Sequence, residues 1–485
     1  MKILFATSEA FPLIKTGGLG DVSGSLPLAL KSLRQDVRLI LPAYPAARRR
    51  IARLRVMAEF ELPPFPGTVR ILRGRLPATR LPLYLVDAPL LFDRAGDPYR
   101  APNGGNWQDN HLRFGLFAQA VVRAALGQAN LDWQPDIVHC NDWQTGLVPA
   151  LLAAQEERPR TLFTIHNLAY QGLFPPQTLA ELGLDSRLWH SEALEFYGQL
   201  SFIKGGLVFA DHLTTVSPTY AEEIQTLRQG YGLAGLLTHR RDQLTGILNG
   251  IDYREWDPHG DPYIHTPFDA ETLANKASNK HALQEAFGLE PRPRTPLLAF
   301  IGRLVEQKGI DLLLDAVLPL LAQQDLQLVL LGTGEAGLER RVRDLIATFP
   351  DRVAGHIGYS EAHAHLIEAG ADIFVMPSRF EPCGLNQMYS LRYGTPPVVR
   401  RTGGLADTVV DATAATLKNG TATGFHFEQD DPLALREALL RALALYDRPS
   451  AWRRLAQQGM TRDFSWERSA RDYIALYKSL MKKTN

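Results

Sequence analysis

Segments typical of β-strands and of α-helices alternate along the whole chain, and this alternation constrains the fold more than any other feature. Apolar runs such as KILFAT (2–7), DIVHC (136–140), LLAFIG (297–302) and DIFVMP (372–377) are separated by longer segments with helical character. Strands that alternate with helices in this way form parallel sheets covered by helices on both faces. The sequence therefore predicts an α/β fold made of open, doubly wound sheets.

The strand and helix pattern occurs once in each half of the chain, which indicates two domains. A chain of 485 residues is longer than one hydrophobic core usually serves. Regular periodicity gives way to Gly, Pro and Asp in ILNGIDYREWDPHGDP (247–262). We therefore expect a first domain at 1–250, a second at 251–465 and a final helix at 466–485.

The final helix is amphipathic. Its expected apolar face contains Ala470, Tyr473, Ile474, Tyr477 and Met481, and its other face contains Arg471, Lys478 and Lys482. Such an apolar stripe must pack against a domain, although the pattern does not say which one.

The composition excludes several classes of protein. Lys plus Arg and Asp plus Glu both total 52, so no overall positive field exists to attract nucleic acid or an anionic membrane. No apolar run approaches the roughly 20 residues that span a bilayer, and the amino terminus lacks a secretory pattern. The two cysteines are too few for a disulfide framework, and no spacing of His, Cys and acids matches a metal site. We expect a cytosolic protein without a structural metal.

The stretch KTGGLGDV (15–22) follows the first predicted strand and opens a helix. Backbone N–H groups and the positive end of a helix dipole make such a turn an anion site. Neither common phosphate motif fits. The dinucleotide fingerprint is incomplete because the next strand, VRLIL, ends without an acid, and Lys15 precedes the glycines whereas a P-loop lysine follows them. NAD binding and ATP hydrolysis are therefore disfavoured.

A second basic loop, RLVEQKG, follows the first strand of the second half. Arg303 and Lys308 in this loop suit a diphosphate, since Arg can bind two oxygens and Lys supplies a compact charge. Ligands of open α/β sheets bind at the carboxyl ends of the strands. We therefore expect Lys15 to face Arg303 and Lys308 across a cleft and to bind the same diphosphate.

The string SRFEPCGLNQMYSLRYGTPPVVRRTGG contains a single acid, Glu381, between Phe380 and Pro382. A positioned carboxylate beside a sugar is common in glycosyl chemistry. The turn from Thr402 to Gly404 precedes another helix and predicts a second phosphate contact.

Two polar strings, HCNDWQTG and TIHNLAYQG, follow strands of the first half. They contain His139, Asp142, Trp143, His166 and Asn167. Their common location at one sheet edge predicts a polar pocket with an aromatic wall, which suits a carbohydrate.

Seven motifs resemble, in the same order, those of the bacterial glycogen synthase and plant starch synthase family. They are KTGGLGDV, the HxxDW of HCNDW, HNLAYQG, FIKGG, NGID, GRLVEQKG and SRFEPCGLNQ. The resemblance implies a GT-B fold, with two Rossmann-like domains and a terminal helix that returns to the first. It also implies retaining transfer of glucose from ADP-glucose to the nonreducing end of an α-1,4-glucan, without a metal or other cofactor.

Site residues follow from the motif positions. The resemblance places Lys15, Gly18 and Asp21 on a donor loop, Arg303 and Lys308 at phosphates, His166 and Glu381 at the reacting glucose, Asp142 and Asn249 in the same cleft, and Tyr359 beside the adenine. Thr16, Gly17, Cys383, Gly384, Leu385, Thr402, Gly403 and Gly404 are further expected substrate contacts.

Four alternatives remain open at this point. A UDP-glucose-using transferase or an epimerase can share the two-domain architecture, and so can a phosphorylase with a pyridoxal phosphate lysine. A noncatalytic glucan-binding protein would use Trp107, Trp143 and Tyr170 as stacking platforms. The sequence does not predict an oligomeric state.

Overall fold

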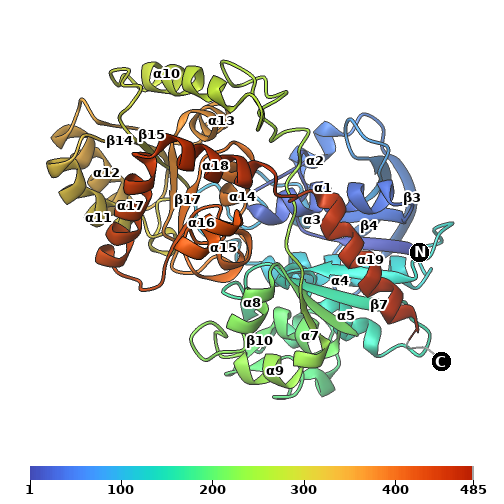
Figure 1. Cartoon of the computed structure of the whole chain (residues 1–485). Coiled ribbons are helices and arrows are strands. Elements are labelled where there is room, and N and C mark those ends of the chain that lie inside the picture. The colour runs from blue at the N-terminus through green and yellow to red at the C-terminus, as the bar shows by residue number, and fades with distance from the viewer. Residues whose placement is uncertain (483–485) are drawn as a thin grey trace. The chain divides into compact units, whose positions relative to one another are not determined.

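The structure is a computed structural model, and it describes residues 1–482. The chain divides into two compact units (Figure 1). Unit 1 contains Met1–Gly250 together with the C-terminal segment that starts at Trp466, and unit 2 contains Ile251–Ser465. Each unit has its own central sheet, and the predicted α/β fold is confirmed.

The sheet of unit 1 has nine strands in the order β12-β11-β7-β6-β1-β2-β5-β4-β3. The strands are β1 (Lys2–Ala6), β2 (Asp36–Pro42), β3 (Arg55–Glu61), β4 (Thr68–Arg75), β5 (Pro82–Asp87), β6 (Ile137–Asn141), β7 (Arg160–Ile165), β11 (His212–Thr215) and β12 (Leu244–Gly246). The pairs β3/β4 and β4/β5 are antiparallel, so this edge departs from the parallel arrangement of the other strands. The six residues between β4 and β5 are too few for a crossover helix.

The helices of unit 1 surround this sheet. They are α1 (Gly18–Ser32), α2 (Pro45–Arg50), α3 (Pro89–Phe92), α4 (Asn110–Ala125), α5 (Leu147–Ala153), α6 (Thr178–Glu181), α7 (Phe202–Phe209), α8 (Pro218–Glu223), α9 (Ala234–His239) and α19 (Trp466–Lys482). A small antiparallel sheet of β8 (Leu173–Phe174), β9 (Glu195–Phe196) and β10 (Gln199–Ser201) lies outside the main sheet.

Helix α19 packs on unit 1, where it lies beside α1 (Figure 1). The Tyr477 hydroxyl is 2.7 Å from Nδ1 of the buried His139, and the Ser469 hydroxyl donates to the Leu248 carbonyl at 2.6 Å. The predicted apolar face is wrong at its end: Leu480 is buried, whereas Met481 is 38% exposed.

The sheet of unit 2 has six parallel strands in the order β15-β14-β13-β16-β17-β18. These are β13 (Leu297–Ile301), β14 (Gln327–Gly332), β15 (Val353–Ile357), β16 (Ile373–Met376), β17 (Pro397–Arg400) and β18 (Phe425–Phe427). The helices are α10 (Lys276–Ala286), α11 (Ile310–Gln323), α12 (Ala336–Thr348), α13 (Glu361–Gly370), α14 (Asn386–Arg392), α15 (Gly403–Thr408), α16 (Ala414–Asn419), α17 (Pro432–Tyr446) and α18 (Pro449–Met460). In α11, the fully buried Ile310, Leu313, Val317 and Leu321 recur every three or four residues and form its core face.

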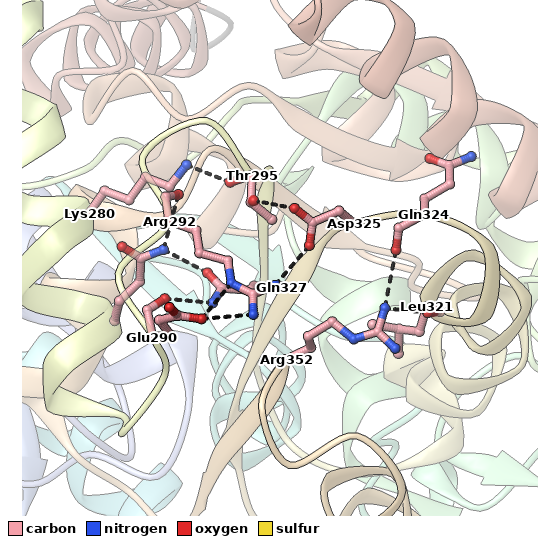
Figure 2. A network of polar contacts seen from close by, with 10 residues as sticks. Lys280, Glu290, Arg292, Thr295, Leu321, Gln324, Asp325, Gln327 and Arg352 are labelled. Carbon is pink, nitrogen blue, oxygen red and sulfur yellow. Dashed lines mark hydrogen bonds and ion pairs between the residues drawn. The ribbon is translucent and has the colours of Figure 1, made fainter.

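Polar side chains form hydrogen bonds with one another at the amino-terminal ends of the unit 2 strands (Figure 2). Arg292 and Thr295 donate to the two carboxylate oxygens of Asp325 at 3.0 and 2.6 Å. The buried Gln327 side chain, at the start of β14, donates to the Glu290 carbonyl at 2.9 Å. Because these groups satisfy one another, we interpret this edge as structural; the ligand-binding candidates of unit 2 lie at the opposite, carboxyl-terminal edge.

A buried charged cluster ties the first segment of unit 2 to α13. The His365 side chain is fully buried, and its Nδ1 is 2.7 Å from Oδ2 of Asp261. The Tyr393 hydroxyl donates to the same oxygen at 2.5 Å, and the Trp256 ring stacks on the imidazole at 3.8 Å. Burial alone lowers the pKa of His365, but the hydrogen bond to Asp261 and the ion pair with Glu361 outweigh it and raise that pKa to about 9. His365 is therefore an imidazolium at neutral pH.

We expect unit 2 to become less stable at alkaline pH, because His365 loses its proton there and the charged cluster is lost. The folded-state pKa lies above the ordinary value of about 6.5, so the stabilisation is complete below pH 6.5 and is lost as pH rises through 9. The loss should reach up to about 3 kcal/mol. Hydrogen exchange of the α13 amides between pH 6.5 and 9.5 measures it. The His365→Gln variant keeps the neighbouring Lys276 and Glu368, and an equal pH dependence in that variant would show that His365 is not responsible.

None of the helices within residues 1–482 is long and apolar enough to cross a membrane.

Candidate active site

The loop between β1 and α1 presents an open backbone. A Cβ atom added to Gly17 or Gly18 would meet no atom within 4 Å. Gly17 has an extended backbone with φ −160°, a conformation that any residue can adopt. Glycine therefore matters at this position because it leaves space beside the loop, and not because the backbone conformation is unusual. The amino end of α1 at Gly18 is consequently accessible to an anion, as the sequence predicts.

Lys15 lies beside this opening and forms an ion pair with Asp21. Its Nζ is 2.7 Å from Oδ1 of Asp21, and the two side chains are 38% and 21% exposed. A pair this accessible to water is weak, so an incoming diphosphate can take over the ammonium.

Glu9, which the sequence analysis missed as a site residue, holds this loop in place. The Thr16 N–H and hydroxyl donate to its two oxygens at 2.5 and 2.9 Å, and the Tyr99 hydroxyl donates to Oε1 at 2.6 Å. Only 2% of Glu9 is exposed, and this burial raises its pKa although the hydrogen bonds oppose the change. An acid directly after a buried strand, in the string SEAFP, is the signal that could have identified it.

Asp142 and His166 meet at the carboxyl ends of the neighbouring strands β6 and β7. The buried Asp142 has φ +57°, which is rare for a residue other than glycine, and its Oδ1 accepts the His166 N–H at 2.7 Å. Burial raises the pKa of Asp142 to about 7 and lowers that of His166 to about 3, so the imidazole is neutral.

The tautomer of His166 follows from its neighbour. The Asn141 amide nitrogen donates to the Ala6 carbonyl at 3.0 Å, which directs its Oδ1 towards Nε2 of His166, 2.9 Å away. Nε2 therefore carries the proton, and Nδ1 is the hydrogen-bond acceptor that a ligand can use.

Two residues of the predicted carbohydrate pocket are structural instead. His139 is fully buried between the Tyr477 and Thr164 hydroxyls, and burial lowers its pKa to about 3. The Trp143 ring packs against Phe114, 5.0 Å between centroids, and Phe174, so it is not an open aromatic wall. Sequence position alone did not separate them from Asp142 and His166, because all four residues lie in or just after buried strands.

Asn249 lies at the end of unit 1. It is 7% exposed, and its side-chain oxygen has no hydrogen-bond partner among the described residues. Buried polar atoms are nearly always paired in folded proteins, so this oxygen is available to a ligand donor.

In unit 2, Lys308 and Glu381 form the central pair of the site. Lys308 Nζ is 2.5 Å from Oε2 of Glu381, which also accepts the Ser378 hydroxyl at 3.0 Å. Glu381 is 7% exposed. Arg303 lies on the same loop as Lys308, is exposed, and contacts Gln307 at 3.2 Å, so its guanidinium is accessible.

The conformation of the Lys308 loop depends on Gly309. This residue has φ +65°, and a Cβ there would lie 2.0 Å from the Pro377 carbonyl oxygen. Only glycine fits, so the loop after β13 is fixed directly against the segment that follows β16 and carries Glu381.

The turn from Thr402 to Gly404 packs on the Glu381 segment. A Cβ on Gly403 would lie 2.0 Å from the Glu381 carbonyl oxygen, and one on Gly404 would lie 2.1 Å from that of Cys383. The Gly404 N–H donates to the Glu381 carbonyl at 3.1 Å. The Gly404 N–H is therefore used within the protein and α15 is only six residues long, and the phosphate contact expected at this turn stays a prediction.

The remaining predicted residues of unit 2 lie nearby in the fold. Cys383 is a buried thiol, Gly384 has φ +73° and Leu385 precedes α14. Tyr359 follows β15 and is 79% exposed, with its hydroxyl bonded to Glu361. Most of this side chain is therefore accessible to solvent.

The predicted residues form two half-sites, each defined within its own unit. Lys15, Asp142 and His166 follow β1, β6 and β7, which are adjacent in the unit 1 sheet. Arg303 and Glu381 follow the adjacent strands β13 and β16 of unit 2. Within residues 1–482, no group of three or more His, Cys, Asp or Glu side chains could hold a metal ion.

Comparison with known families identifies the class of protein. The model of the starch synthase catalytic domain matches residues 2–239, and that of glycosyl transferases group 1 matches residues 284–459. Sucrose-phosphate synthase from Thermosynechococcus elongatus shares the fold alone, with a TM-score of 0.59, 17% identity and full coverage of both chains. The two Rossmann-like units and the two family matches define a glycosyltransferase of the GT-B fold.

Individual relatives narrow this class. The chain is 61% identical to glycogen synthase from Thioalkalivibrio sulfidiphilus over 99% of its length and 100% of the relative, and 56% identical to that of Cellvibrio japonicus over 99% of both. The catalytic domain of starch synthase IV from Arabidopsis thaliana, bound to ADP and acarbose, superposes with a TM-score of 0.89 at 35% identity over 99% of both chains. The chain belongs to the glycogen synthase family, which confirms the resemblance found in the motifs.

Proposed function

We propose that this protein transfers glucose from ADP-glucose to the nonreducing end of an α-1,4-glucan, with retention of the anomeric configuration and release of ADP. The observation that carries the proposal is the contact between Lys308 and Glu381 at the carboxyl edge of the unit 2 sheet. In this contact the Lys308 ammonium, which stabilises the leaving diphosphate, lies next to the Glu381 carboxylate, which acts on the neutral sugar. The Arabidopsis relative, described as bound to ADP and acarbose, supports the choice of nucleotide and of acceptor.

Charge stabilisation is the main catalytic contribution in this proposal. Negative charge develops on the diphosphate as the bond to glucose breaks, and preorganised cations stabilise that charge most in the transition state. Arg303 and Lys308 supply these cations in the half-site of unit 2, and Lys15 is the corresponding cation in the half-site of unit 1. Tyr359 stacks on the adenine.

We propose distinct roles for the polar groups of the two half-sites. Glu381 stabilises the reacting sugar as positive character develops at its anomeric carbon. His166 is neutral and accepts a glucose hydroxyl at Nδ1, while the side-chain oxygen of Asn249 accepts another. Asp142 fixes the backbone of His166. Because arginine and lysine balance the diphosphate, we propose that transfer needs no metal or other cofactor.

The test is transfer itself. We expect release of ADP and growth of glycogen chains when the protein is incubated with ADP-glucose and glycogen, at the same rate with and without EDTA. UDP-glucose should support a much lower rate. Failure to release ADP or to extend the glucan would refute the proposal, a preference for UDP-glucose would correct the donor, and loss of activity in EDTA would show that a metal is required.

A further inference from the structure

One arginine of unit 2, Arg379, ties the loop that carries Lys308 to the segment that carries Glu381. Arg379 follows β16 and precedes Glu381 by two residues. Its backbone N–H donates to the Gln307 carbonyl at 2.8 Å, and its Nη1 donates to the Glu306 carbonyl at 2.6 Å. Both acceptors belong to the single 3-10 turn that ends at Lys308. Arg379 therefore fixes the backbone just before the lysine.

The same side chain also fixes the backbone just after the lysine. Nη1 and Nη2 of Arg379 donate to the two carboxylate oxygens of Asp311 at 2.8 and 2.7 Å. Asp311 lies in the first turn of α11, which begins directly after the Lys308 loop. This is the two-bond pairing that the planar guanidinium of arginine makes and that lysine cannot make. The loop is thus held on both sides of Lys308 by one residue.

The guanidinium of Arg379 is used within the protein, so it has little capacity left for a ligand. Besides its bonds to Glu306 and Asp311, its Nε is 3.1 Å from Oδ1 of Asp430 and 4.0 Å from Oε1 of Glu306. The side chain is 20% exposed. Arg303 differs, because its guanidinium is exposed on the loop itself. Arg379 is therefore suited to hold another cation in place and not to bind a phosphate.

Arg379 also neutralises acids beside the loop. Asp311, Asp430 and Glu306 all present carboxylate oxygens to its guanidinium. Burial alone would raise the pKa of Asp311, but the hydrogen bonds and the charge of Arg379 lower it, so this carboxylate is ionised. Without the guanidinium, these like charges would repel one another, and the first turn of α11 would lose its attachment.

We propose that Arg379 is a positioning residue for glucose transfer and that it acts through Lys308. Its bonds to Glu306 and Asp311 hold the loop in the conformation that puts the lysine ammonium 2.5 Å from Oε2 of Glu381. A cation that is fixed before the donor arrives stabilises the leaving diphosphate without a further cost of ordering the loop. The inference rests on the proposed function, because that function assigns the diphosphate to Lys308.

A double-mutant cycle tests this role. Arg379→Met removes the guanidinium and keeps an unbranched side chain. We expect it to lower kcat about tenfold and to weaken ADP binding by a similar factor, which corresponds to about 1.4 kcal/mol. In the Lys308→Ala background, the same change should cost less than about twofold, because the group that Arg379 positions is absent. Arg379→Lys keeps the charge and should recover part of the loss.

The matched control is Arg341→Met. Arg341 on α12 donates to Asp315 on α11 at 2.6 Å, so this variant also breaks an arginine–aspartate pair of α11, one turn beyond Asp311. It should leave kcat and ADP affinity unchanged. Equal losses from Arg379→Met in the wild-type and Lys308→Ala backgrounds would overturn the positioning role and indicate a general structural effect. Wild-type kcat and ADP affinity in Arg379→Met would overturn it as well.

Thermal unfolding shows whether each variant is folded. If Arg379→Met does not fold, Asp311→Asn replaces it in the cycle, since asparagine has nearly the shape of aspartate and should show the same dependence on Lys308. ADP binding is measured without ADP-glucose or glucan. Coupling between Arg379 and Lys308 in ADP affinity, in a protein whose wild type releases no ADP, would refute the transfer activity and not the positioning role. A wild type that does not bind ADP would refute both.

Discussion

The Lys308→Ala variant is expected to lose about a hundredfold or more in kcat, because one preorganised cation at the leaving diphosphate is removed. ADP release at saturating ADP-glucose and glycogen measures this loss. Lys308→Arg keeps the charge but changes its geometry, and it should retain more activity than alanine. A kcat within a factor of a few of the wild type in Lys308→Ala would contradict the assigned role.

Stability provides the control for this variant. Removing Lys308 leaves the 7% exposed Glu381 with Ser378 as its remaining side-chain partner, and an unpaired buried charge is destabilising. The double variant Lys308→Ala, Glu381→Ala removes both charges, so it should recover part of the lost stability and none of the lost activity. Recovery of activity in the double variant would show that the single change acted through misfolding.

Glu381→Gln is expected to lower kcat about a thousandfold, within the range typical of a carboxylate that acts at the reacting centre. Glutamine has nearly the same shape and can still accept the Ser378 hydroxyl, so the variant removes the charge and little else. The same ADP-release assay gives kcat, and equilibrium binding of ADP reports on the nucleotide site.

Binding of ADP distinguishes two explanations of a low rate in Glu381→Gln. In one, Glu381 acts on the sugar; in the other, it mainly positions Lys308. If Glu381 acts on the sugar, ADP binds Glu381→Gln at least as tightly as it binds the wild type, because no cation has been lost. A large fall in ADP affinity would mean that Glu381 mainly positions Lys308. Wild-type turnover in the variant would remove Glu381 from the catalytic centre.

Local patterns predicted much of the fold. The main parallel strands and α11 are apolar or amphipathic runs bounded by Gly and Pro, and such signals lie within a few residues of each other. The antiparallel edge strand β3 was missed because its exposed and half-buried side chains lack that apolar signal. Met481 was misplaced because a helical face shifts easily by one residue near its end.

The sequence by itself determined the two doubly wound sheets and the position of Lys15, Arg303 and Glu381 at strand ends, because strand periodicity and glycine turns are properties of neighbouring residues. Only the tertiary structure decided which side chains meet. Lys308 and Glu381 are 73 residues apart and touch because β13 and β16 pair and Gly309 admits the Pro377 carbonyl. Packing within unit 1 likewise buries His139 against Tyr477 and brings the Tyr99 hydroxyl to Glu9, since burial and hydrogen-bond partners depend on segments that are distant along the chain.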